Sequence, residues 1–220
     1  MIGAKGYDAA PFRNSITSLR ITSKDDGGGK ALYMTESNLR VYNFDKVMHR
    51  YISSLPKGKR PEESPSSVDA LVRLTNDDCV LVEFKNGVLD KKAFAQVREK
   101  VLSSVLVLGD LLGYSLEEIC QHVDFVLVYN EKKNKSGRSK DVPPAQSIAV
   151  SESRRSITKG FSRKGSKESA LRNSAEGHGR PEFGMRKKLK GFCAREVREC
   201  TESEFGNEFV ANWEHASLSQ

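Results

Sequence analysis

The chain has 220 residues, 37% of them hydrophobic and 30% charged, which is long enough for one domain with a core of its own. Its 36 basic residues exceed its 29 acidic residues by 7, which favours a polyanionic partner. The four cysteines form no CxxC pair, and no apolar run approaches the ~20 residues of a membrane span, so we expect a cytoplasmic protein without membrane association.

Residues 1–34 are rich in Gly and Ser, and we expect a flexible N-terminal segment there. The first helix is predicted over roughly residues 43–55, with a start as early as Thr35 left open. Its apolar residues recur at helical spacing and suit the face of a sheet: Phe44, Val47, Met48, Tyr51, Ile52 and Leu55.

Residues 66–87 predict a β-hairpin. Apolar side chains alternate with other residues in two runs, 68–74 and 80–85, and turn residues separate the runs. One face of the hairpin is apolar throughout. The other face carries leucines toward the turn and charged residues toward the open end.

The charged residues of this second face are Asp69, Glu83 and Lys85. Side chains two positions apart share a face of a strand, so Glu83 and Lys85 project together. Asp69 joins them only if the strands pair with an even offset, which an odd-length loop over residues 76–78 would give. Two carboxylates and an ammonium on one face predict a divalent-metal site.

Two further helices and a strand follow the hairpin. Residues 91–112 form the longest apolar helical stripe, and Gly113 is a common helix terminator. A short helix over residues 116–122 opens with the pattern of a capping box, and residues 124–130 form an apolar strand. The element order predicts an α/β fold over residues 35–130, with a mixed central β-sheet flanked by helices.

The apolar periodicity stops over residues 131–180, where we expect a flexible, basic insertion. Residues 131–190 carry 17 basic and 6 acidic side chains. A solvated segment without a ligand is left open, because few aromatics interleave the charges. Residues 181–220 are expected to complete the domain with a strand and a helix. The densest basic points could follow a nucleic-acid backbone: Arg154, Arg155, Arg163, Lys164, Arg186, Lys187 and Lys188.

Asp69 is followed after thirteen residues by Glu83-Phe84-Lys85 on the adjacent strand, and then by a helix and a strand. This motif and element order resemble the PD-(D/E)XK nuclease superfamily. This superfamily includes restriction endonucleases, junction resolvases and phage exonucleases. The resemblance covers residues 36–130 and implies a restriction-endonuclease-like αββ(β)αβ core. Val68 stands where the superfamily signature has proline, which is a departure from the pattern.

The resemblance implies a metal-dependent nuclease that acts on nucleic acid, with DNA as the expected substrate. Asp69 and Glu83 would bind Mg²⁺ or Mn²⁺ together with the carbonyl oxygen of Phe84. Lys85 would orient or deprotonate the attacking water, or stabilise charge on the phosphate.

The resemblance also implies an additional acidic residue from the first helix, for which Glu36 and Asp45 are both candidates. On the following helix, Gln96 and Lys100 lie one turn apart and could reach the scissile bond.

Several other interpretations of the same residues stay open. The tripeptide ExK recurs at residues 131–133, so it is a weak signal alone. Residues 66–87 could be a surface hairpin with a cross-strand ion pair, or belong to an inactive nuclease-like domain that binds nucleic acid or protein. Zinc binding by Cys193, Cys200 and a histidine competes with ordinary packing. The oligomeric state is open, a dimer included.

Overall fold

The computed structural model describes residues 6–25, 27, 31–74, 77–134 and 184–218. Its main element is a mixed six-stranded sheet in the order β1-β4-β5-β6-β7-β8. Neighbouring strands from β1 to β6 pair antiparallel, and β6, β7 and β8 pair parallel. The strands are β1 (Ile16–Ser18), β4 (Arg40–Asn43), β5 (Ala70–Arg73), β6 (Cys79–Lys85), β7 (Val123–Tyr129) and β8 (Val197–Thr201), with a separate hairpin of β2 (Lys24–Asp25) and β3 (Leu32–Tyr33).

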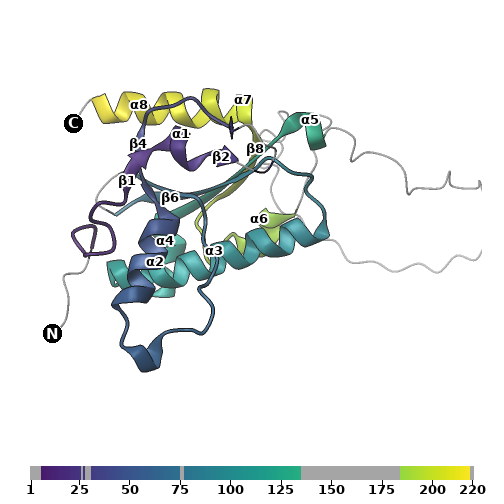
Figure 1. Ribbon diagram of the computed structural model, residues 1–220. Coiled ribbons are helices and arrows are strands. Elements are labelled where there is room, and N and C mark those ends of the chain that lie inside the picture. The colour runs from purple at the N-terminus through teal and green to yellow at the C-terminus, as the bar shows by residue number, and fades with distance from the viewer. Residues whose placement is uncertain (1–5, 26, 28–30, 75–76, 135–183, 219–220) are drawn as a thin grey trace, which may run out of the picture. The chain divides into compact units, whose positions relative to one another are not determined.

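Helices cover both faces of this sheet (Figure 1). One face carries α2 (Phe44–Ser54), α3 (Lys91–Leu112), α4 (Leu116–His122) and α6 (Met185–Leu189). The other carries α1 (Leu19–Thr22), α7 (Glu202–Phe205), the π-helical turn η2 (Gly206–Val210) and α8 (Ala211–Leu218). Two further short helices are η1 (Lys57–Lys59) and α5 (Glu131–Asn134). The predicted α/β class with a mixed sheet flanked by helices is confirmed, whereas the nuclease-type core stays a prediction.

Alternation along the central strands divides the hydrophobic core into two. Leu71 and Leu81 pack in the core beneath α3, whereas Val72 and Val82 pack in the core beneath α7. Because β6 is covered on both faces, its residues are buried at six of seven positions. Glu83 is one of these buried residues and lies on the α3 face, since it is two positions from Leu81.

The predicted bounds of the long helix are confirmed, since α3 spans Lys91–Leu112. The Asp90 side chain caps it by accepting a hydrogen bond from the Ala93 N–H. Gly113 ends it with a φ of 77°, a conformation that glycine adopts without strain. The capping box of α4 is present as predicted.

The N-terminal region differs from the prediction of a flexible segment over residues 1–34. Phe12 and Leu19 are buried, and β1 forms the edge of the sheet beside β4. The early helix start at Thr35 is wrong, because α2 begins at Phe44 and its N-cap is Asn43, whose side chain accepts from the Lys46 N–H. Strands of two to four residues are too short to show a clear alternation, which explains the difference.

Of the predicted basic insertion over residues 131–180, only the first four residues are described, and they form α5. Arg154, Arg155, Arg163 and Lys164 lie outside the described residues. No helix in the described ranges combines the length and apolar character that crossing a membrane requires.

Candidate metal centre

The register between β5 and β6 decides which charged side chains meet. Leu71 lies opposite Leu81 in this antiparallel pair, so the offset is even. One step beyond the ladder, the Asp69 N–H donates to the Val82 carbonyl at 3.1 Å. Asp69 lies one position before the paired residues, and the Lys100 ammonium of α3 contacts both Asp69 and Glu83, so the two carboxylates meet on the face covered by α3, as predicted.

The backbone of β6 holds one oxygen of Asp69. The Phe84 N–H donates to Asp69 Oδ2 at 2.7 Å. The carbonyl of Phe84 is directed to the same side of β6, because the N–H and C=O of a strand residue face the same neighbour in an antiparallel pair. Asp69 Oδ1 and the Phe84 carbonyl are therefore on one side of the strand.

Lys100 of α3 bridges the two carboxylates. Its Nζ lies 2.8 Å from Glu83 Oε1, 3.1 Å from Glu83 Oε2 and 3.6 Å from Asp69 Oδ1. The exposed fraction of the side chain is 0% for Glu83, 20% for Asp69 and 23% for Lys100. We call these three residues the acidic cluster, since one cation in it lies within reach of two carboxylates.

Packing of α3 against the start of β5 determines where Lys100 lies. Ser104, one turn after Lys100, is buried and its Oγ accepts from the Val68 N–H at 3.0 Å. The neighbouring Ser103 hydroxyl donates to the Ser66 carbonyl. These two bonds fix the helix over the strand, and residues four apart on a helix share a face, so Lys100 is directed at the carboxylates.

The protonation equilibria of the acidic cluster are perturbed. Burial raises the pKa of Glu83, and the negative charge of Asp69 raises it further. Burial also raises the pKa of Asp69, although Lys100 and the Phe84 N–H oppose this. Desolvation acts to lower the pKa of Lys100, but the two carboxylates outweigh it and raise that pKa. Pairs of buried groups with shifted pKa values are common in functional sites and also occur in structural ion pairs.

Two of the other predicted site residues border the acidic cluster. The positive charge of Lys85 acts to lower the pKa of both Asp69 and Glu83, and within the described ranges its ammonium forms no ion pair. The charge of Asp45, in the first turn of α2, acts to raise the pKa of Asp69. Asp45 Oδ1 accepts from the Ser67 Oγ at 2.5 Å.

The remaining two candidates are not brought into the cluster. Glu36 lies before α2, is 77% exposed and accepts a hydrogen bond from Arg20 Nε at 2.7 Å. Gln96 is exposed one turn before Lys100 and makes no polar contact in the described part of the chain. Of the two first-helix candidates, Asp45 is therefore the one that borders the carboxylates.

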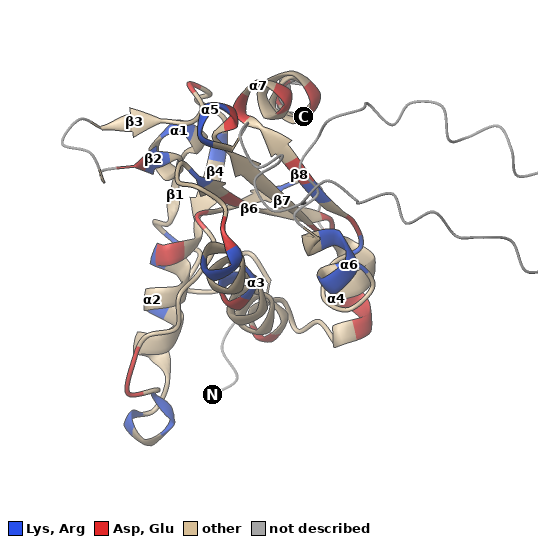
Figure 2. Ribbon diagram, turned by 90° about the vertical axis from the view of Figure 1, so that its right-hand side faces the viewer, with Lys and Arg blue, Asp and Glu red and all other residues tan. Residues whose placement is uncertain are grey.

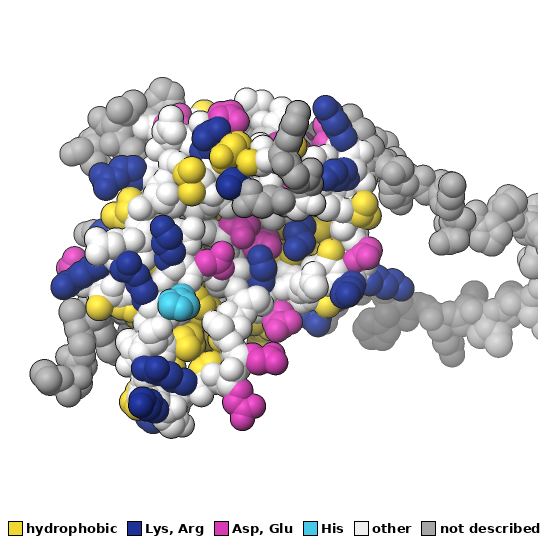
Figure 3. All heavy atoms as spheres, in the orientation of Figure 1, with side chains coloured by type: hydrophobic (Ala, Val, Ile, Leu, Met, Phe, Trp, Pro, Cys, Tyr) yellow, Lys and Arg dark blue, Asp and Glu magenta, His cyan; other side chains and the backbone are white. Residues whose placement is uncertain are grey.

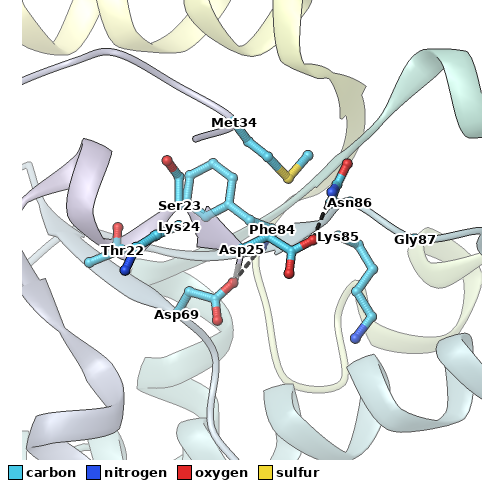
Figure 4. Close-up of a pocket in the computed structure, with 10 residues that line it drawn as sticks. All are labelled: Thr22, Ser23, Lys24, Asp25, Met34, Asp69, Phe84, Lys85, Asn86 and Gly87. Carbon is cyan, nitrogen blue, oxygen red and sulfur yellow. Dashed lines mark hydrogen bonds between the residues drawn. The ribbon is translucent and has the colours of Figure 1, made fainter. Parts of the chain in front are cut away.

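A cavity of about 270 Å³ opens beside Asp69 (Figure 4). Its wall includes Asp25 of β2, whose Oδ2 accepts from Asn86 Nδ2 at 2.7 Å. Asn130, after β7, donates in turn to Asn86 Oδ1 at 2.8 Å, so hydrogen bonds connect three segments of the chain at this wall. Lys85 also lines this cavity. The sequence does not predict the contact of Asp25 with Asn86, because the two residues are 61 positions apart in the chain.

The donor atoms of the acidic cluster suit a hard cation. In the described ranges no three His, Cys, Asp and Glu side chains form a group that could hold a metal ion, which leaves the zinc interpretation without support. Cys193 and Cys200 are buried in the core. Mg²⁺ differs from zinc, since it keeps several waters and takes only one or two carboxylates together with substrate phosphates. Asp69, Glu83 and the Phe84 carbonyl therefore fit Mg²⁺ or Mn²⁺ by number and type.

Exposed basic residues lie on α3, α5 and α6 (Figure 2). Arg186, Lys187 and Lys188, which were predicted to bind nucleic acid, are exposed on α6. Acidic and basic side chains are intermixed on the face shown in Figure 3, without one continuous basic surface. A nucleic acid would therefore meet separate basic stretches on the described part of the protein.

Comparison of the chain with protein-family models, curated proteins and solved structures returned no match.

Proposed function

We propose that the protein is a divalent-metal-dependent nuclease that hydrolyses phosphodiester bonds in nucleic acid, with DNA as the substrate to test first. One observation carries the proposal: the Lys100 ammonium lies 2.8 Å from Glu83 and 3.6 Å from Asp69. A single cation thus reaches two carboxylates that come from different strands.

Each residue of the site has a role in this proposal. A bound Mg²⁺ or Mn²⁺ ion would acidify a water molecule and offset charge on the phosphate. Asp69 Oδ1, Glu83 and the Phe84 carbonyl would hold the ion. Lys85 lines the cavity and its ammonium forms no ion pair with another described residue, so it can hold the attacking water or donate to the phosphate. Asp45 would accept a hydrogen bond from a metal-bound water.

The charge distribution supports a nucleic-acid substrate. Residues 131–190 carry a net charge of +11, and the exposed basic residues of α6 belong to this region. Basic stretches of this kind contact phosphates without reading sequence. We further propose a cytoplasmic location, because all four cysteines are free.

The test is cleavage of plasmid DNA with Mg²⁺ or Mn²⁺ by the wild type and by Glu83→Gln and Lys85→Ala. Each variant is expected to lose at least about 100-fold in rate, the usual cost of removing a group that stabilises the transition state. Lys92→Ala, which changes an exposed lysine on α3, should cleave normally, and chelation should stop the wild type. Circular dichroism checks that the variants fold. Wild-type rates in both Glu83→Gln and Lys85→Ala would show that the site is assigned wrongly.

A second candidate is a catalytically inactive domain that binds nucleic acid or a protein. The complete burial of Glu83 and its pairing with Lys100 favour it, since the ammonium already donates to both oxygens of this carboxylate. This candidate predicts no cleavage product at any Mg²⁺ or Mn²⁺ concentration. If the ligand is nucleic acid, binding should still weaken steeply with salt.

A further inference from the structure

The Lys100 ammonium lies where the two carboxylates converge. It donates to both oxygens of Glu83 and lies 3.6 Å from the Asp69 oxygen that the backbone leaves free. The other Asp69 oxygen is held by the Phe84 N–H. The position open to a metal ion between the carboxylates is therefore the position of this ammonium.

The charges of the acidic cluster do not balance. When both carboxylates are ionised they bring two negative charges, and Lys100 contributes one positive charge at contact distance. A divalent ion would supply two positive charges to the same oxygens. Since a buried charge without compensation is costly, the carboxylates interact more favourably with the divalent ion than with the ammonium.

We propose that Lys100 is a built-in competitor of the metal ion: its ammonium holds the cation position in the metal-free protein, and a divalent ion binds only by displacing it. This inference rests on the proposed metal-dependent function and adds a form of regulation to it. Metal occupancy then depends on how much more strongly the carboxylates bind the metal ion than the Lys100 ammonium, and not on the carboxylates alone.

The surroundings of Lys100 allow its side chain to move while α3 stays in place. The hydrogen bonds of Ser103 and Ser104 hold the helix against the residues before β5. The Lys100 side chain is 23% exposed, so its flexible stem already reaches solvent. Asp69 also borders a cavity of about 270 Å³, so this carboxylate is not enclosed on every side. A displaced ammonium would remain at the mouth of the site, where it can contact a substrate phosphate.

The test is a titration of Mn²⁺ into the full chain, with free Mn²⁺ measured by electron paramagnetic resonance. Lys100→Met removes the competing charge and keeps the length of the side chain. Lys92→Met is the matched control, since it removes an exposed lysine from the same helix. We expect Lys100→Met to bind Mn²⁺ at least about tenfold more tightly than the wild type, because the ion no longer has to break charge-assisted hydrogen bonds. Lys92→Met should bind like the wild type.

Two other results would overturn the inference in different ways. Equal or weaker Mn²⁺ binding by Lys100→Met would remove the competitor role, while binding and cleavage by the wild type would leave the proposed nuclease function standing. No Mn²⁺ binding to either protein would overturn the competitor role and the metal-dependent function together.

A second measurement avoids the variant altogether, in case Lys100→Met does not fold. Amine acetylation of the wild type, read by mass spectrometry, should modify Lys100 slowly in chelator and several-fold faster in Mn²⁺. Lys92 should react at the same rate in both conditions. A Lys100 rate that does not change with Mn²⁺, in a protein that binds the ion, would contradict displacement.

Discussion

Two ion clusters lie near opposite ends of β6, and they differ in burial and in the number of hydrogen-bond partners per carboxylate. The acidic cluster, near the end of the strand, has two carboxylates, one ammonium and a fully buried Glu83. The second cluster lies around the start of the strand, and we call it the balanced cluster. It joins Asp78, Asp124, Arg195 and His122, which are 23–38% exposed.

In the balanced cluster each carboxylate has two side-chain hydrogen bonds. Arg195 donates to Asp124 through Nε at 3.0 Å and Nη2 at 2.9 Å, and its Nη1 lies 3.2 Å from Asp78 Oδ1. His122 Nδ1 lies 3.1 Å from the same Asp78 oxygen. Partial desolvation acts to raise the pKa of Asp78, but the hydrogen bond with His122 and the charge of Arg195 outweigh it and lower that pKa.

The two clusters respond to ionisation in opposite directions. In the balanced cluster the lowered pKa of Asp78 means that folding favours its charged form. In the acidic cluster the raised pKa values of Asp69 and Glu83 mean that folding disfavours the charged forms of these two side chains. A fold that keeps a destabilised buried pair beside a cavity is more consistent with a binding site than with a structural network.

The largest expected effect is on the stability of the metal-free protein. Lys100→Met should lower the free energy of unfolding by about 3–5 kcal/mol, because it leaves buried carboxylates unpaired. Arg195→Met should cost about 1 kcal/mol, because its partners stay in contact with water. Urea unfolding in chelator measures both. Equal losses would show that burial does not distinguish the clusters.

Metal addition should separate the two clusters further. Mg²⁺ at about 100 times its Kd should stabilise the wild type by ~2.7 kcal/mol, since only the folded chain binds it. Glu83→Gln should abolish this gain and Arg195→Met should retain it. Thermal unfolding with and without Mg²⁺ is the measurement, and a gain that survives in Glu83→Gln would place the ion elsewhere.

The pH dependence of stability should carry opposite signs at the two ends of β6. A carboxyl group whose pKa is raised by folding stabilises the protein at low pH, and this stability is lost as pH rises from the unfolded to the folded pKa. The metal-free wild type should therefore lose about 1 kcal/mol or more of unfolding free energy between roughly pH 5 and pH 8, relative to Glu83→Gln. The lowered pKa of Asp78 contributes stability above its unfolded pKa that is lost as pH falls. Asp78→Asn should therefore flatten the acid side of the profile, whereas Glu83→Gln flattens the neutral side. Urea titrations at a series of pH values would detect a reversal of these signs.

The smallest expected effect concerns the basic residues outside both clusters. Replacing Lys187 and Lys188 of α6 by Ala should weaken DNA binding a few-fold and reduce the salt slope by about 2, without changing stability. Fluorescence anisotropy at several salt concentrations measures this. An unchanged slope would exclude α6 from the phosphate contacts.

The sequence predicted the elements that have strong periodicity. The stripe of α3 and the glycine after it identify its bounds, and Leu71 lies opposite Leu81 with the even offset that an odd-length loop would give. Strand β4 was missed because four residues carry too little alternation.

The role of Lys100 could not be assigned from sequence. A lysine beside buried helix positions often runs its stem along apolar surface and ends in water. Only the docking of α3 through Ser103 and Ser104 shows that this ammonium meets two carboxylates. The same reason explains Asp25 and Asn86, whose meeting depends on contacts between segments 61 positions apart in the chain.

The Phe84 amide has a consequence for ion selection. It holds one oxygen of Asp69 in a hydrogen bond, so this carboxylate offers a cation its other oxygen, Oδ1, more readily than both. Calcium prefers six to eight oxygens and readily accepts both atoms of a carboxylate, whereas magnesium needs fewer protein ligands and keeps its water. A main-chain bond within a β-hairpin thereby disfavours the larger ion.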